Sequence, residues 1–96
     1  MKRILLVEDE QALARHLTRL LQAEGFTVVH AATQRAAVAC LEETPLDLAL
    51  VDIRMPGMDG LELCQRVRER YHDMSIILLT GYADFEYARR GIELQV

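Results

Sequence analysis

The segment RILLVEDE, residues 3–10, joins four consecutive apolar residues to three consecutive acidic ones. The apolar run Ile4–Val7 has no polar residue at alternate positions, which is typical of a strand buried on both faces of a parallel sheet. Glu8, Asp9 and Glu10 follow this buried strand directly. Adjacent carboxylates repel one another and raise each other's pKa unless a cation intervenes. The segment therefore predicts both the centre of a sheet and a site that holds a cation.

The rest of the chain repeats the alternation of a short apolar run with a helical pattern. Further strands are predicted at Phe26–His30, Leu48–Ile53 and Ser75–Leu79. Helices are predicted at Gln11–Glu24, at Thr33–Glu43, from an N-cap at Asp59 onward, and at Ala83–Leu94. Strands that alternate with helices indicate an α/β fold, a doubly wound parallel sheet with right-handed crossovers. We expect residues 1–96 to form one domain.

Composition excludes several classes of function. The formal net charge is −4, which argues against direct binding of nucleic acid, because phosphate contacts require Lys and Arg. The sequence has no signal peptide and no long apolar stretch, so no membrane association is expected and the cytoplasm is the expected location. Cys40 and Cys64 form no CxxC motif and fall at apolar positions of the helical patterns, where we expect them to be small buried residues.

Acidic residues gather at the predicted carboxyl ends of the strands, where open α/β sheets bind ligands. Glu8 and Asp9 follow the first strand, Asp52 ends the buried run LALVD, and Thr80 follows the fourth strand. The second strand ends at His30 and contributes no reactive group. Carboxylate oxygens suit Mg²⁺, which binds one or two carboxylates together with waters and phosphate oxygens. Beside such a metal Asp52 could act as a nucleophile and form an acyl phosphate, with the Thr80 hydroxyl as a donor.

Each of these residues also has a structural interpretation. Asp9 could cap the first helix, and Glu10 could favour the positive end of the same helix. Thr80 precedes Gly81 and could serve a turn. Asp52 is harder to explain in this way, because an unpaired carboxylate at the end of a buried strand is costly.

Three motifs in the same order resemble the receiver domain of two-component response regulators: LLVEDE (residues 5–10), LALVDIRMPGMDG (48–60) and IILLTGYADFEYA (76–88). The resemblance implies a flavodoxin-like topology with strand order 2-1-3-4. It implies that Glu8, Asp9 and Asp52 bind Mg²⁺ together with the backbone carbonyl of Arg54. It also implies that Asp52 receives a phosphoryl group from a sensor histidine kinase. Thr80 would be the switch hydroxyl, acting with the helix Ala83–Leu94.

The resemblance further implies a phosphoacceptor rather than an enzyme, linked in a longer chain to an output domain that binds DNA. Receiver domains also have a fifth strand, which carries a phosphate-pairing lysine and an aromatic residue, and a fifth helix. Residues 1–96 contain a single lysine, Lys2, so we expect a receiver domain that is incomplete at its C-terminus. The apolar fourth strand would then be a sheet edge through which the chain associates with a copy of itself or with a partner.

An alternative function is a binding or assembly module that has the receiver shape but does not switch, because the lysine is missing. Two other classes fit the residues less well. Many phosphatases with an aspartate nucleophile need a second Asp two residues later, where this chain has Arg54. A flavin-binding module needs a hydroxyl- and glycine-rich loop after the first strand, and EDEQ (residues 8–11) has the opposite charge.

Overall fold

The computed structural model describes residues 2–52 and 60–79. The elements follow the chain in the order β1 (Arg3–Val7), α1 (Gln11–Ala23), β2 (Thr27–Ala31), α2 (Gln34–Glu43), β3 (Leu48–Asp52), α3 (Gly60–Arg70) and β4 (Ser75–Leu79). All strand pairs are parallel and the order is β2-β1-β3-β4. This confirms the predicted α/β fold and its strand order. The predicted helix Ala83–Leu94 lies outside the described residues.

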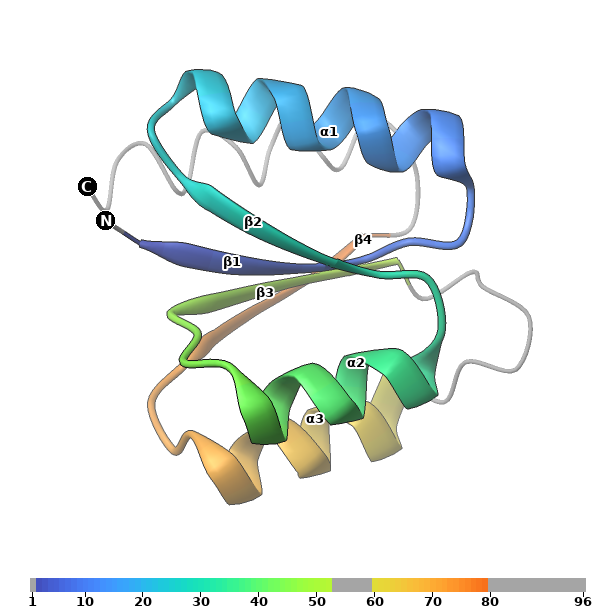
Figure 1. The fold of residues 1–96 in the computed structure, drawn as a ribbon. Helices are drawn as coiled ribbons and strands as arrows, with labels where there is room; N and C mark the ends of the chain where they lie inside the picture. Colours follow the sequence, from blue (N-terminus) through green and yellow to red (C-terminus); the bar gives the residue numbers. More distant parts are fainter. Residues whose placement is uncertain (1, 53–59, 80–96) are drawn as a thin grey trace.

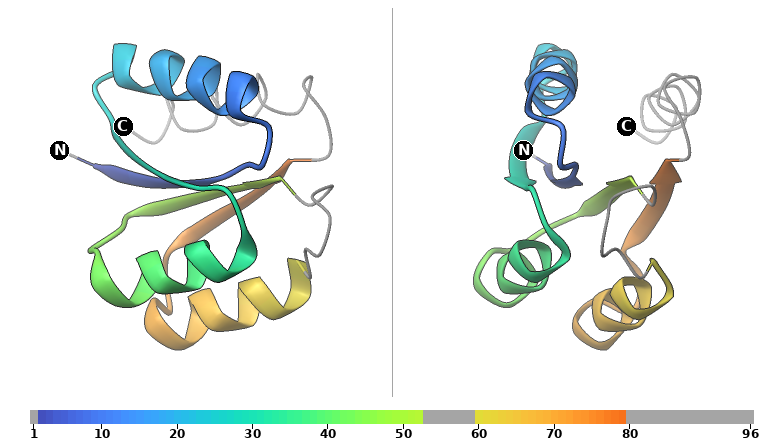
Figure 2. Two further views of the ribbon diagram at one scale, coloured as in Figure 1. Left: turned by 45° about the vertical axis from the view of Figure 1, so that its right-hand side comes forward. Right: turned by 90° about the vertical axis from the view of Figure 1, so that its right-hand side faces the viewer.

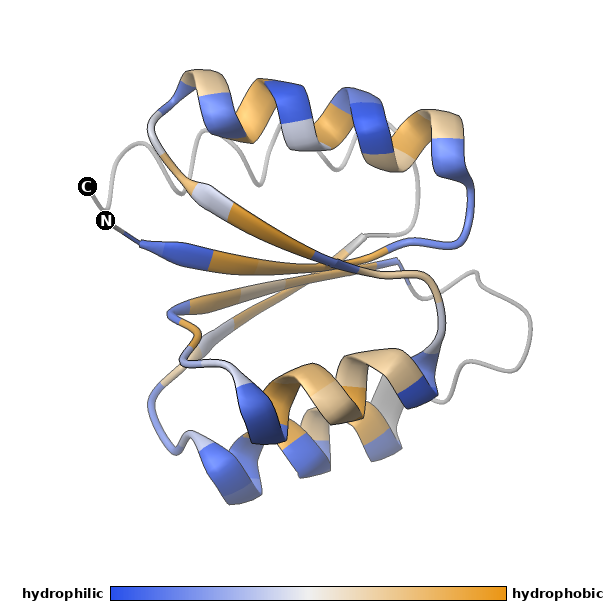
Figure 3. Cartoon of the chain, in the orientation of Figure 1, coloured by the Kyte–Doolittle hydropathy of each residue, from blue (hydrophilic) through white to orange (hydrophobic). Residues whose placement is uncertain are grey.

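The sheet is covered on both faces. Helix α1 packs on one face, and α2 and α3 pack on the other (Figures 1 and 2). Each described helix contributes apolar residues to the cores beside the sheet, and hydrophobic and hydrophilic residues alternate along the helices in Figure 3. None of the described helices is long and apolar enough to cross a membrane.

Strand β1 lies between β2 and β3, and four of its five residues are buried. All four residues of Ile4–Val7 are 0% exposed. Successive side chains of a strand point to opposite faces, so Ile4 and Leu6 pack into the core under α1, while Leu5 and Val7 pack into the core under α2 and α3. The unbroken apolar run in the sequence is explained by these two cores.

Helix α1 buries Ala14, Leu17 and Leu21, which lie on one face at a spacing of three and four residues. Its N-cap is Glu10, whose side chain makes no capping hydrogen bond. The interpretation of Asp9 as the cap is therefore wrong, because the helix begins one residue later than that role requires. After α1 the chain reverses at Gly25, whose φ of 94° is favourable only for a residue without a Cβ.

Both ends of β2 differ from prediction because strand pairing, rather than apolar character, sets them. β2 pairs with β1 from Arg3↔Thr27 to Val7↔Ala31, so β2 begins after Phe26 and includes Ala31. The second helix begins at Gln34, and Thr33 is its N-cap, with the side chain accepting a hydrogen bond from Ala36 N at 3.0 Å.

The two cysteines are free and partly buried rather than fully buried. Cys40, in α2, packs against the core under α2 and α3.

Specific hydrogen bonds hold the amino end of the sheet. Arg3 N donates to Asp47 Oδ2 at 2.8 Å, and Asp47 N donates back to Arg3 O at 2.9 Å. The Tyr71 hydroxyl, just beyond α3, donates to Thr44 O at 3.1 Å and accepts from Leu46 N at 3.2 Å. One phenol group thus satisfies both a donor and an acceptor of the loop between α2 and β3.

We expect Tyr71→Phe to lower the free energy of unfolding by about 1–2 kcal/mol, because it leaves a partly buried N–H and C=O without their partner. Urea denaturation followed by circular dichroism measures the change. His72→Gln, an exposed substitution next to it, should change stability by less than about 0.5 kcal/mol. A Tyr71→Phe variant as stable as the wild type would show that ring burial alone fixes this loop.

Candidate functional site

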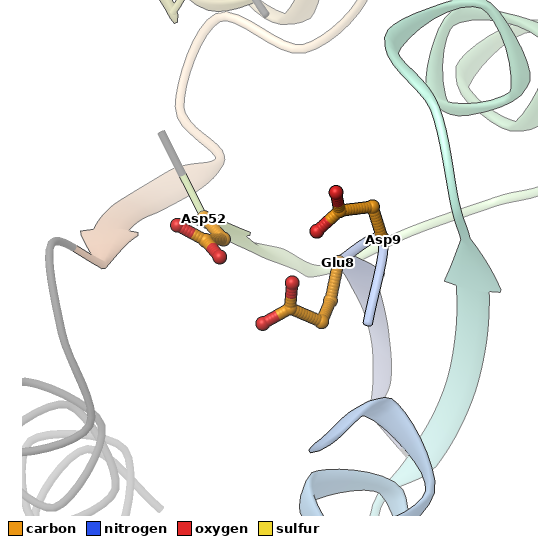
Figure 4. Close-up of side chains that lie close together, drawn as sticks. All are labelled: Glu8, Asp9 and Asp52. Carbon is orange, nitrogen blue, oxygen red and sulfur yellow. The ribbon is translucent and has the colours of Figure 1, made fainter. Parts of the chain in front are cut away.

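The carboxyl ends of β1 and β3 bring three acidic side chains together. Val7 and Val51 are paired in the register of the two strands, so Glu8, which follows β1, and Asp52, the last residue of β3, lie side by side. Asp9 follows Glu8. One carboxylate oxygen from each of the three residues lies within 4.8 Å of the others. Figure 4 shows the three carboxyl groups directed toward one another.

The three carboxyl groups differ in their exposure to solvent. Glu8 is 2% exposed and is the one charged side chain buried among residues 2–52 and 60–79. Asp52 is partly buried and Asp9 is exposed. The cluster is therefore closed to solvent at Glu8 and open to solvent at Asp9, and Asp52 is intermediate in exposure.

The cluster shifts the titration of its buried member. The pKa of Glu8 is raised to about 7, chiefly by burial and in addition by a hydrogen bond with the Asp52 carboxyl group and by the negative charge of Asp52. The hydrogen bond that Glu10 N donates to Glu8 Oε2, at 3.4 Å, lowers the pKa of Glu8 and so acts against this rise. Without a cation, the site is therefore most stable when Glu8 holds a proton.

The backbone of Glu8 is fixed from the side of β2. Glu8 N donates to Ala31 O at 3.0 Å. The Nε2 atom of His30 lies 2.7 Å from Glu8 O, and because a carbonyl oxygen only accepts, His30 is the donor. The sequence predicted no functional residue at the end of this strand. His30 comes close to Glu8 because it lies near the end of the strand that pairs with β1.

The donor set fits a hard divalent cation such as Mg²⁺. It consists of three carboxylate groups, the ligand type that Mg²⁺ prefers, and its open side leaves room for waters. No Lys or Arg in the described part of the chain forms an ion pair with Glu8 to offset its burial. A divalent cation would supply that positive charge. Thr80 and Arg54, the other predicted site residues, lie outside the described residues.

The family model of the response regulator receiver domain matches residues 4–96. Among curated proteins, the chain is 43% identical over 83 residues to the response regulator receiver protein CpdR of Brucella abortus, covering 86% of this chain and 69% of CpdR. It is 39% identical to the regulatory protein VanR of Enterococcus faecium, covering 82% of this chain and 34% of VanR. The chain thus spans about a third of the longer regulator.

Solved structures give the same result. The response regulator TrrA of Thermotoga maritima, in complex with Mg²⁺ and BeF, is 38% identical, with a TM-score of 0.78 over 91% of this chain and 76% of that one. TrrA in complex with the histidine kinase ThkA matches at 40% identity, with a TM-score of 0.76 over 85% of this chain and 71% of the matched one.

The raised pKa of Glu8 predicts a pH dependence of stability in metal-free buffer. Between pH 4.5, the ordinary pKa of a glutamate, and about 7, folded Glu8 keeps a proton that the unfolded chain releases. The folded state then binds more protons, so the free energy of unfolding falls as pH rises through this window, by about 1–3 kcal/mol from this group.

Glu8→Gln should remove this part of the pH dependence, which urea denaturation with a chelator across the pH series would measure. Glu69→Gln, at an exposed glutamate of α3, is the matched control and should keep the wild-type profile. Parallel profiles for the wild type and Glu8→Gln would contradict the assignment to Glu8.

Proposed function

The chain belongs to the response regulator receiver domain family, and from this premise we propose that it accepts a phosphoryl group on Asp52 from a sensor histidine kinase, with Mg²⁺ bound at Glu8, Asp9 and Asp52. The observation that carries the proposal is the convergence of these three carboxyl groups at the carboxyl ends of β1 and β3. A histidine kinase partner is supported by the complex of the similar protein TrrA with ThkA.

Asp52 is suited to the role of nucleophile by its position. It is the last residue of β3, where the strand leaves the buried core, and its carboxyl group is partly accessible. A carboxylate oxygen of Asp52 attacks phosphorus, the P–O bond forms as the P–N bond to the kinase histidine breaks, and the imidazole leaves. The product is an acyl phosphate on Asp52.

Glu8 and Asp9 hold the cation beside Asp52. When bound, Mg²⁺ offsets the negative charges of the carboxylates and of the incoming phosphoryl oxygens, and so permits them to approach one another. Glu8 contributes a buried carboxylate, on a main chain held by hydrogen bonds with Ala31 O and with the His30 imidazole, and Asp9 contributes an exposed one. We assign a further ligand, the Arg54 carbonyl, and the switch hydroxyl, Thr80, from the family motifs alone.

We further propose that phosphorylation acts as a signal rather than as a step of metabolism. An aspartyl phosphate adds negative charge at the end of β3 and can bias a two-state element of the protein. Thr80 and the segment Ala83–Leu94 are the element proposed here. The receiver would control a DNA-binding output domain, which is supported by relatives such as the transcriptional regulatory protein DctD of Rhizobium meliloti, of which this chain covers 20%. The cytoplasm is the proposed location.

We expect Asp52→Asn to reduce phosphorylation to background, because an amide oxygen is a poor nucleophile and cannot form the acyl phosphate. The measurement is intact mass after incubation with acetyl phosphate and Mg²⁺, repeated with a phosphorylated histidine kinase. Removal of Mg²⁺ with EDTA should have the same effect as the substitution.

Asp73→Asn is the matched control for this experiment, because Asp73 is exposed and precedes β4 at the opposite end of the sheet. It should be phosphorylated like the wild type. Phosphorylation of Asp52→Asn at the wild-type level would place the phosphoacceptor elsewhere and refute the proposal.

A second candidate function, assembly without switching, is favoured by the edge of the described sheet. There β4 pairs with β3 and has no second neighbour, and Leu78, at 44% exposure, is the one large exposed hydrophobic residue among those described. Lys2, the single lysine of residues 1–96, precedes β1 at the end of the sheet opposite the acids, so it is not in the position of the phosphate-pairing lysine. An apolar edge strand can pair with the edge of a second copy.

If this second function holds, light scattering across a concentration series should show a mass that rises with concentration. Leu78→Lys should keep the chain monomeric, because a charge on the edge opposes strand pairing. Gln65→Lys, an exposed position on α3, adds the same charge away from the edge and should not. A wild-type chain that stays monomeric throughout would exclude the assembly function.

A further inference from the structure

The hydrogen bond from His30 to Glu8 stands where the backbone ladder between β1 and β2 ends. Glu8 N donates to Ala31 O, the last bond of the parallel pair. In a regular parallel ladder, the next bond would reach Glu8 O from the N–H two residues beyond Ala31. That residue is Thr33, which instead caps α2. The His30 imidazole supplies the donor that the departing strand no longer provides.

This bond controls the geometry of both acids that follow β1. The Glu8 carbonyl belongs to the same planar peptide unit as the Asp9 N–H. Fixing the carbonyl oxygen therefore fixes the plane that joins Glu8 to Asp9. The bond from Glu8 N to Ala31 O fixes the preceding peptide plane, so both backbone torsions of Glu8 are determined by contacts with β2.

His30 has little role in packing. It is an exposed residue of β2 and belongs to neither hydrophobic core, unlike its neighbours Val28 and Val29, which pack against the two cores. Its polar contact is thus separable from the burial that stabilises the sheet.

We propose that His30 is a positioning residue for the metal site: its Nε2–H holds the Glu8–Asp9 peptide plane so that the two carboxylates and Asp52 are preorganised for a divalent cation. The inference rests on the proposed function, because it concerns the same cation. Outer groups that orient the ligands of a metal commonly change its affinity when they are removed.

The test compares two substitutions of His30 in a magnesium chloride titration followed by the amide NMR spectrum of the whole chain. His30→Leu removes the donor at similar size and should weaken Mg²⁺ binding by about 3- to 10-fold. His30→Gln places an amide N–H close to the position of Nε2 and should keep the affinity within about twofold of the wild type. His72→Leu, at an exposed histidine before β4, is the matched control.

A second measurement observes the bond directly. The ¹⁵N spectrum of the His30 ring in the metal-free protein should show hydrogen on Nε2, and a ring with hydrogen on Nδ1 alone would overturn the proposal. Unfolding in urea without metal reports stability separately. Equal loss of stability in both His30 variants with unchanged Mg²⁺ affinity would reduce His30 to a structural residue and overturn the inference.

The outcomes also separate this inference from the proposed function. A wild-type chain that binds no Mg²⁺ would refute the metal site itself, and with it the role of His30. A wild-type chain that binds Mg²⁺ as tightly as His30→Leu would leave the metal site intact and refute only the positioning role.

Discussion

Burial of β1 on both faces is the constraint on which the rest of the structure depends. The strand contributes side chains to two separate hydrophobic cores and hydrogen-bonds to a strand on each side. Its backbone is thereby fixed in all directions, and only its two ends are free of the core. The residues that follow Val7 are therefore held in position by the strand that precedes them. A charged cluster can be held there because the cost of ordering it is offset by the apolar strand behind it.

The same burial sets the electrostatics of the cluster. Glu8 lies at the boundary of the core, and its ionised form is disfavoured both by burial and by Asp52. A protein selected for stability alone would place an apolar residue at this position. Retaining a buried carboxylate is typical of a site whose charge is matched by something that binds, and here the geometry of three oxygen ligands fits a divalent cation. Without the cation, the protein is therefore less stable than it would be with an apolar residue at this position.

Much of the fold could be predicted from the sequence because its strands are short apolar runs separated by amphipathic helices. The convergence of Glu8, Asp9 and Asp52 also followed, since strand ends in a parallel sheet share one edge. Three details could not be predicted. Glu10 rather than Asp9 is the N-cap, which depends on the torsions of a single residue. β2 runs to Ala31 because pairing with β1 extends that far. The His30 side chain contacts a backbone oxygen of Glu8, and no pattern of side chains in the sequence indicates such a contact.

The register of β1 has a consequence for how this sequence can vary in evolution. Alternate residues of the strand belong to opposite cores, and the positions of the acids Glu8 and Asp9 are set by the number of residues in the same strand. Insertion or deletion of a single residue in Ile4–Val7 would exchange the side chains between the two cores and turn the first acid toward the opposite face. Exchange of one apolar residue for another leaves that count unchanged. We therefore expect relatives to differ in β1 by substitution and to preserve its length, so that the spacing between core and acids is inherited more strictly than the identity of any core residue.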